Sequence, residues 1–131
     1  MATTTATLTL NSPDLTGDAL ALSTTATLTK AGTLTGLDQT SGVGRKTTTA
    51  TSQYTLVAKG DYSDDKAHKV YIKNTSNTAT ENLIITIESQ LLGRLYAGDW
   101  TLLPYNGDQD IKITPSVSTA MTVEYLVIFE A

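Results

Sequence analysis

Threonine in alternating positions is the feature that most constrains what this chain can fold into. The 131-residue sequence holds 26 threonines, and 18 of them fall within residues 1–60. In residues 5–10, the apolar side chains of Ala6, Leu8 and Leu10 alternate with three threonines. A period of two places the apolar side chains on one face of an extended strand, and β-branched threonine favours that conformation. The pattern predicts half-buried strands and hence an all-β protein.

Stronger strand patterns occupy the second half of the chain. Apolar residues alternate with other residues in four segments, at residues 70–73, 83–88, 111–114 and 121–130. The last segment becomes apolar on both faces near its end, which is typical of a strand in the middle of a sheet or against a partner chain. Because short strands separated by turn clusters are the pattern of a sandwich, we expect an antiparallel, jelly-roll-like β-sandwich of about eight strands.

The most specific turn signal is the Asn-Gly pair at residues 106–107. Both residues tolerate the positive φ of a tight two-residue turn. The pair therefore predicts a hairpin between the strand that contains Leu102 and Leu103 and the strand that begins at Ile111.

A short repeat links two parts of the threonine-rich half. Residues 4–9 and 24–29 share the sequence Thr-Thr-Ala-Thr-Leu-Thr. Such a match is compatible with a duplicated strand, and more often it reflects low complexity in a chain so rich in threonine.

The length suits a single domain, which we expect to span residues 1–131. Large side chains are distributed unevenly, because seven of the eight aromatic residues lie after residue 60 and Tyr54 is the exception. Formal charge is uneven too, at +1 for residues 1–60 and −5 for the remainder. We expect the core to be built mainly after residue 61, with the threonine-rich half supplying edges and contacts and residues 1–12 forming an extended arm.

Composition disfavours several classes of protein. The chain has no cysteine and one histidine, so neither a disulfide framework nor a metal or cofactor site is expected. We expect His68 to lie exposed at the end of a strand rather than in a catalytic site. A net charge of −4 gives no reason to expect a nucleic-acid partner. No apolar run approaches the ~18 residues of a membrane span and no signal peptide is visible, so we expect synthesis in the cytoplasm and no membrane partner.

Two polar segments resemble ligand sites but fail on detail. Residues 42–47 lack the glycine that a phosphate-binding loop requires directly before its lysine. We interpret them as a flexible basic loop, of which Arg45 and Lys46 could meet an acidic surface on a neighbouring subunit. The acidic segment Asp61–Asp65 does not match a calcium-binding loop, so we interpret it as a solvated loop and leave a bound ion open.

Three aromatic residues, Tyr96, Trp100 and Tyr105, lie around a Gly-Asp turn at residues 98–99. In a chain with few other large side chains, they could simply fill the core. Aromatic rings near a loop also anchor protein interfaces and stack on sugar rings. The sequence favours core packing and leaves a subunit interface and a glycan site open.

Five segments combine strand and turn patterns in a recognisable way, at residues 1–10, 69–76, 93–100, 110–113 and 123–130. Together they resemble small virion structural proteins of tailed bacteriophages, especially of phages that infect marine cyanobacteria. The resemblance implies a capsid decoration (cement) protein. Such a protein would be a β-sandwich that oligomerises, commonly as a trimer, on a capsid lattice.

The resemblance also implies partners and a location. The partners would be the major capsid protein and further copies of the chain, at the surface of a virion, with no enzymatic activity and no cofactor. The candidate interface residues are Leu8, Leu10, Arg45, Lys46, Tyr96, Trp100 and Tyr105. One alternative is a receptor- or glycan-binding module of a tail or fibre, which would use the region of Trp100 and Tyr105. A hydrolase built on a β-sandwich has the least support.

Overall fold

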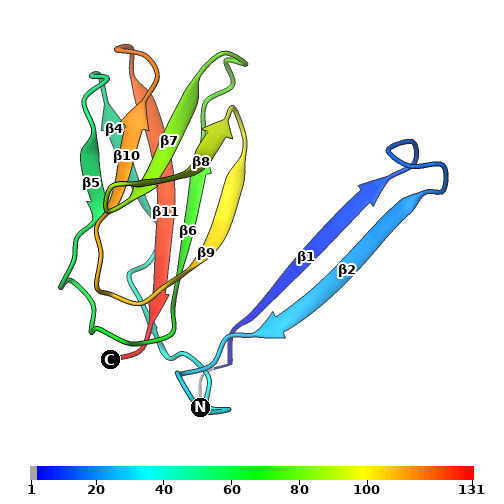
Figure 1. The fold of residues 1–131 in the computed structure, drawn as a ribbon, viewed down its shortest axis with the longest axis vertical. Helices are drawn as coiled ribbons and strands as arrows, with labels where there is room; N and C mark the ends of the chain where they lie inside the picture. Colours follow the sequence, from blue (N-terminus) through cyan, green and yellow to red (C-terminus); the bar gives the residue numbers. More distant parts are fainter. Residues whose placement is uncertain (1–2) are drawn as a thin grey trace.

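The computed structural model describes residues 3–131, which form eleven β-strands and no helix. The strands are β1 (Thr5–Ser12), β2 (Leu20–Thr27), β3 (Gln39–Thr40), β4 (Gly44–Thr48), β5 (Tyr54–Val57), β6 (His68–Asn74), β7 (Asn82–Ile87), β8 (Gln90–Tyr96), β9 (Trp100–Tyr105), β10 (Ile111–Pro115) and β11 (Met121–Phe129). Strands β1 and β2 form a hairpin of their own, and the remaining strands form two sheets that face each other (Figure 1).

The two sheets have the strand order of a jelly roll. One sheet runs β5-β10-β7-β8, and the other runs β4-β11-β6-β9, with the short strand β3 also paired to β11. From β4 to β11 the chain crosses from one sheet to the other at almost every connection, while β7 and β8 are joined within one sheet. This alternation is the jelly-roll arrangement of two Greek keys. It confirms the predicted all-β sandwich.

The hydrophobic core lies between the two sheets. Burial of each large aliphatic side chain there contributes about 1.5–3 kcal/mol relative to exposure. Among the described residues, Val57 is the one core member that precedes residue 61, as the uneven distribution of large side chains predicts. The core comprises Val57, Val70, Ile72, Leu83, Ile85, Leu95, Leu103, Tyr105, Ile111, Ile113, Met121, Val123 and Val127.

Strand β11 holds the middle of its sheet, pairing with β6 along one edge and with β3 and β4 along the other. Val123 and Val127 face the core. Leu126 and Ile128 lie on the outer face, where they line a hollow together with the buried side chain of Leu37. A central position therefore accounts for the two apolar faces of this strand.

The Asn-Gly pair at residues 106–107 does not make the predicted hairpin. The flanking strands β9 and β10 belong to different sheets, so the segment carries the chain across the sandwich. Gly107 is still required, because its φ is +89° and a Cβ atom there would overlap the backbone oxygen of Ser63. The pattern correctly indicated a turn with positive φ, but the predicted pairing of β9 with β10 was wrong.

His68 is fully buried, so the prediction of an exposed strand end was wrong. Its ring packs among the rings of Tyr62, Tyr105 and Phe129, with centroids 5.8, 6.1 and 6.3 Å away. The Nδ1 atom accepts a hydrogen bond of 3.3 Å from the backbone N–H of Glu130, so Nε2 carries the proton. Nε2 then donates to the backbone oxygen of Ser63 at 2.8 Å. The ring is therefore a neutral, fully bonded element of the core.

Candidate interaction surface

Strands β1 and β2 form a two-stranded antiparallel ribbon that extends away from the sandwich (Figure 1). We call residues 5–27 the arm. The two copies of the repeated hexapeptide run along opposite strands of the arm, and their alanines, Ala6 and Ala26, are paired across it. The predicted strand in residues 5–10 is confirmed, but it belongs to a hairpin rather than to a single extended segment.

The arm has one apolar face and one polar face, because side chains alternate along each strand. On the polar face the hydroxyls of Thr7 and Thr25 are hydrogen-bonded at 2.8 Å. Cross-strand pairs of this kind contribute about 0.2–1 kcal/mol each. The apolar face carries Ala6, Leu8, Leu10, Leu20, Leu22 and Ala26, and neither strand contains a charged residue.

The apolar face of the arm is only partly covered. Leu8, Leu10 and Leu22 are 38, 44 and 45% exposed. Within the described part of the chain, the arm forms a sheet of its own with no further strand. A lone two-stranded hairpin is only marginally stable in water. The apolar face of the arm therefore has no further strand of its own sheet beside it among the described residues.

Further exposed apolar side chains lie on the two strands at which the sheets end on the same side of the sandwich. Strand β8 is the last strand of one sheet and β9 is the last strand of the other. Edge strands present unpaired backbone groups in addition to their side chains. We call this surface the β8–β9 edge, and its exposed apolar residues are Leu91, Leu92, Tyr96, Trp100 and Leu102.

The arm and strand β9 of the β8–β9 edge share a groove of about 470 Å³. Leu8 and Leu10 line it from the arm, and Trp100 and Leu102 line it from β9. Three of the predicted interface residues, Leu8, Leu10 and Trp100, are thus brought together. Tyr96 lies on the same edge and is 49% exposed.

Tyr105 does not lie at a surface, although it was a candidate interface residue. Its side chain is 6% exposed and belongs to the core. Its hydroxyl donates a hydrogen bond of 2.8 Å to the backbone oxygen of Gln109. Burial, with the nearby negative charge of Asp110, raises the pKa of this phenol to about 12.

The predicted basic loop is partly a strand. Residues 44–48 form β4, in which Arg45 lies opposite Glu124 of β11. The Arg45 guanidinium donates to the Glu124 carboxylate at 2.7 Å, and together with the Tyr71 hydroxyl it holds the pKa of that carboxyl below its usual value. The Lys46 Nζ atom lies 4.4 Å from the centre of the Tyr54 ring. Both cations therefore have partners within their own chain.

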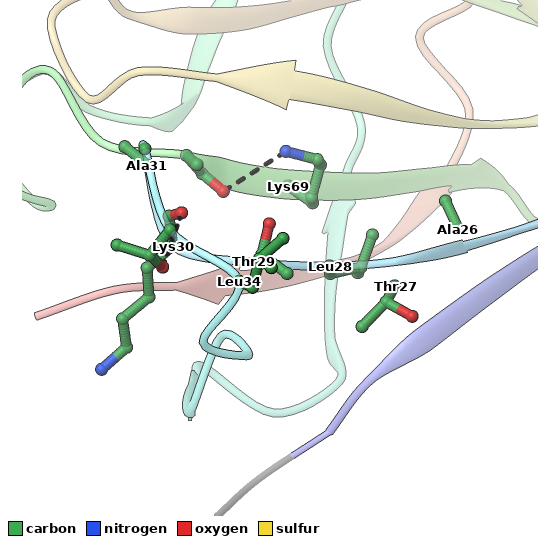
Figure 2. A pocket seen from close by; sticks show the side chains of 11 residues that line it. Ala26, Thr27, Leu28, Thr29, Lys30, Ala31, Leu34 and Lys69 are labelled. Carbon is green, nitrogen blue, oxygen red and sulfur yellow. Dashed lines mark hydrogen bonds between the residues drawn. The ribbon is translucent and has the colours of Figure 1, made fainter.

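The base of the arm is tied to the sandwich. A hollow of about 650 Å³ lies there, lined by residues 26–34, Ala67 and Lys69. Figure 2 shows the side chains that line it. Leu28 is 5% exposed at this point. The Glu130 carboxylate accepts hydrogen bonds from the backbone N–H groups of Ala31, at 2.7 Å, and Ala67, at 3.3 Å. The arm is thus presented from a fixed base.

Glu130 and Ser41 are structural residues that the sequence did not single out. Burial tends to raise the pKa of Glu130, but the N–H donors of Ala31 and Ala67 and the charge of Lys66 outweigh it and lower the pKa. The Ser41 N–H donates to the backbone oxygen of Val127, and the Ser41 hydroxyl oxygen accepts from the Val127 N–H, both at 2.9 Å.

Residues 3–131 contain no group of three or more histidine, aspartate or glutamate side chains that could hold a metal ion. In the same residues there is no helix that is long and apolar enough to cross a membrane. The chain was compared with protein families, curated proteins and solved structures, and nothing in the three comparisons matches it.

Proposed function

We propose that this chain is a non-enzymatic structural protein of a tailed-phage particle, most specifically a decoration protein that binds the assembled capsid. The observation that supports this proposal is the only partly covered amphipathic arm on a well-packed jelly roll. The phage setting rests on the sequence resemblance of residues 1–10, 69–76, 93–100, 110–113 and 123–130. The arm supplies the physical reason for a role in assembly.

An arm of this composition is suited to docking on protein. Its strands are uncharged, so burying them carries no cost of desolvating a charge. Its leucines supply apolar area that is favourable to remove from water. On a capsid, the same contact is repeated on every subunit of the lattice, so copies that are joined to one another would bind several subunits at once and their weak contacts would add up through avidity. The partners in this proposal are the major capsid protein and further copies of the chain.

The test compares the full chain with a variant that lacks residues 2–27. Removing the whole arm is cleaner than removing residues 2–12, because the shorter deletion would leave β2 without its partner strand. We expect the variant to keep the circular dichroism of a folded sandwich. It should fail to sediment with undecorated phage shells and should not raise their melting temperature. Equal binding by the two proteins would refute the proposal that the arm attaches the protein.

A glycan-binding module is the second candidate, and the exposure of Trp100 favours it. The side chain of Trp100 is 54% exposed and lies beside a groove, as a ring that stacks on sugar does. The buried Tyr105 cannot supply the second ring. A titration with host-surface oligosaccharides that shifts Trp100 fluorescence, and a loss of binding in Trp100→Ala, would support this candidate over the decoration role.

A further inference from the structure

Exposed apolar side chains in this protein are concentrated on two surfaces. Among residues 3–131, nine of the eleven large apolar side chains that are exposed lie on the arm or on the β8–β9 edge. On the arm they are Leu8, Leu10, Leu15 and Leu22, and the two outside both surfaces are Leu34 and Val43. We propose that the arm of one copy of this chain docks, through its apolar face, on the β8–β9 edge of a second copy.

The two surfaces match in chemistry. The arm presents leucines, and the edge presents Trp100 and Tyr96 among leucines, a composition that is typical of the anchoring residues of protein interfaces. The arm carries Asp14 and Asp18 at its tip as its charged residues. Around Trp100, Lys73 lies opposite it on β6 and Arg94 lies on β8, against one acid, Asp99, in the turn between β8 and β9. Two acidic arm tips repel each other, whereas the surroundings of Trp100 carry one basic residue more than acidic ones, so the charges favour contact between an arm and an edge over contact between two arms.

The single chain already places these surfaces toward each other without closing them. Leu8 and Leu10 line the same groove as Trp100 and Leu102, yet all four side chains remain more than a third exposed. The hairpin leaves the sandwich at a fixed base and its tip points away from β9 (Figure 1). Because the arm does not close on the β8–β9 edge of its own chain, it can contact the β8–β9 edge of a neighbouring copy. This is the arrangement from which domain exchange between copies proceeds.

The arm brings one face of a two-stranded ribbon to this contact, with the apolar side chains of Ala6, Leu8, Leu10, Leu20, Leu22 and Ala26. The arm and the edge are different patches, so the contact is heterologous. Each copy gives one arm and receives another, which joins copies head to tail.

The test needs only the purified full chain, without shells. Analytical ultracentrifugation should show a concentration-dependent oligomer. An arm variant, Leu8→Thr with Leu22→Thr, and an edge variant, Trp100→Thr with Leu102→Thr, should each raise the dissociation constant at least about tenfold. Threonine suits a strand, so the folds should persist, which circular dichroism checks. The matched control is Leu34→Thr, which removes the most exposed leucine, at 96%, and should leave the association unchanged.

Mixing the two variants gives the most specific result. The edge variant has an intact arm and the arm variant has an intact edge, so at a concentration at which each variant alone is monomeric, the mixture should form a one-to-one dimer. A dimer that forms in the mixture supports the proposal. It is overturned if the full chain stays monomeric at high micromolar concentration, if only one of the two variants loses association, or if the mixture stays monomeric.

This inference goes beyond attachment to a shell, and the two can fail separately. A full chain that stays monomeric but binds shells overturns the contact between copies and leaves the decoration role standing. A full chain that oligomerises through arm and edge but does not bind shells supports the contact between copies and overturns the decoration role.

Discussion

The Glu130 carboxylate accepts a hydrogen bond of 2.7 Å from the backbone N–H of Ala31, which lies 99 residues earlier in the chain. The same oxygen accepts from the N–H of Ala67, and the Lys66 Nζ atom lies 3.6 Å from the other carboxylate oxygen. The Glu130 side chain, which follows β11, thus connects the segment that carries the arm to the residues just before β6. The orientation of the arm depends on a contact at the far end of the sequence.

Replacing Glu130 with alanine should loosen this connection. The substitution leaves two backbone N–H groups without their acceptor, and such losses cost roughly 1–3 kcal/mol. We expect a lower midpoint of urea unfolding and faster hydrogen exchange at the amide of Ala31. The control is Asp38→Ala, which breaks the exposed ion pair to Lys30 and should change the midpoint much less. Equal effects of the two substitutions would contradict the role of Glu130.

Acid should weaken the protein partly through Glu130. The folded state holds the pKa of this carboxyl below its ordinary value of 4.5. Its contribution to stability is therefore fully present above pH 4.5 and is lost as pH falls through the folded pKa. Glu124, whose pKa is lowered mainly by Arg45, contributes in the same direction. In unfolding titrations from neutral to acidic pH, Glu130→Gln should show a shallower loss of stability than the unmodified chain. An identical slope would count against the contribution of Glu130.

Local patterns predicted the strands well because burial alternates with the pleat. Val70 and Ile72 of β6, or Ile111 and Ile113 of β10, face the core at every second position. The Asn-Gly pair could not reveal the sheet of the next strand. A turn motif reports the backbone angles that it tolerates, whereas the partner of a strand is decided by packing across the core.

The candidate interaction surface could be predicted from the sequence to a similar degree as the strands. Alternation correctly indicated an apolar face with Leu8 and Leu10, but no local pattern tells what covers that face. Burial of His68 depends on Glu130, 62 residues away, and the ion pair of Arg45 depends on Glu124, 79 residues away. Such long-range partners follow from the jelly-roll topology rather than from neighbouring residues.

Gly107→Ala should destabilise the protein more than Gly60→Ala. Both glycines have positive φ, +89° and +86°, which costs another residue about 1–2 kcal/mol. At Gly60 a Cβ atom would meet nothing within 4 Å, whereas at Gly107 it would overlap the backbone of Ser63. The difference between the two free energies of unfolding, measured in urea, gives the cost of the overlap. We expect the loss of stability to be about 1–3 kcal/mol greater for Gly107→Ala than for Gly60→Ala. Equal urea midpoints would show that the backbone around Gly107 and Ser63 adjusts to the added methyl group without losing stability.

Alkaline pH should destabilise the fold through Tyr105. Its pKa is raised from 10.0 to about 12 in the folded state, chiefly by burial. Between these values the unfolded chain loses the phenolic proton while the folded chain keeps it, so stability falls as pH rises from 10 to 12. Tyr54, also raised to about 12, acts in the same direction. Tyr105→Phe should reduce the slope of stability against pH in this range, and a slope that does not change would contradict the assignment.

His68→Phe should lower stability by about 2–4 kcal/mol although the aromatic ring is kept, because a buried polar group without its partner costs about 1–3 kcal/mol. Phenylalanine still packs among the rings of Tyr62, Tyr105 and Phe129, but it can neither accept from the Glu130 N–H nor donate to the Ser63 oxygen. Urea unfolding followed by circular dichroism measures the loss. Tyr96→Phe is the matched control, since Tyr96 is an exposed ring on the β8–β9 edge, and we expect no comparable change. If His68→Phe were as stable as the unmodified chain, the two hydrogen bonds would not contribute to stability, and the histidine would serve as a ring alone.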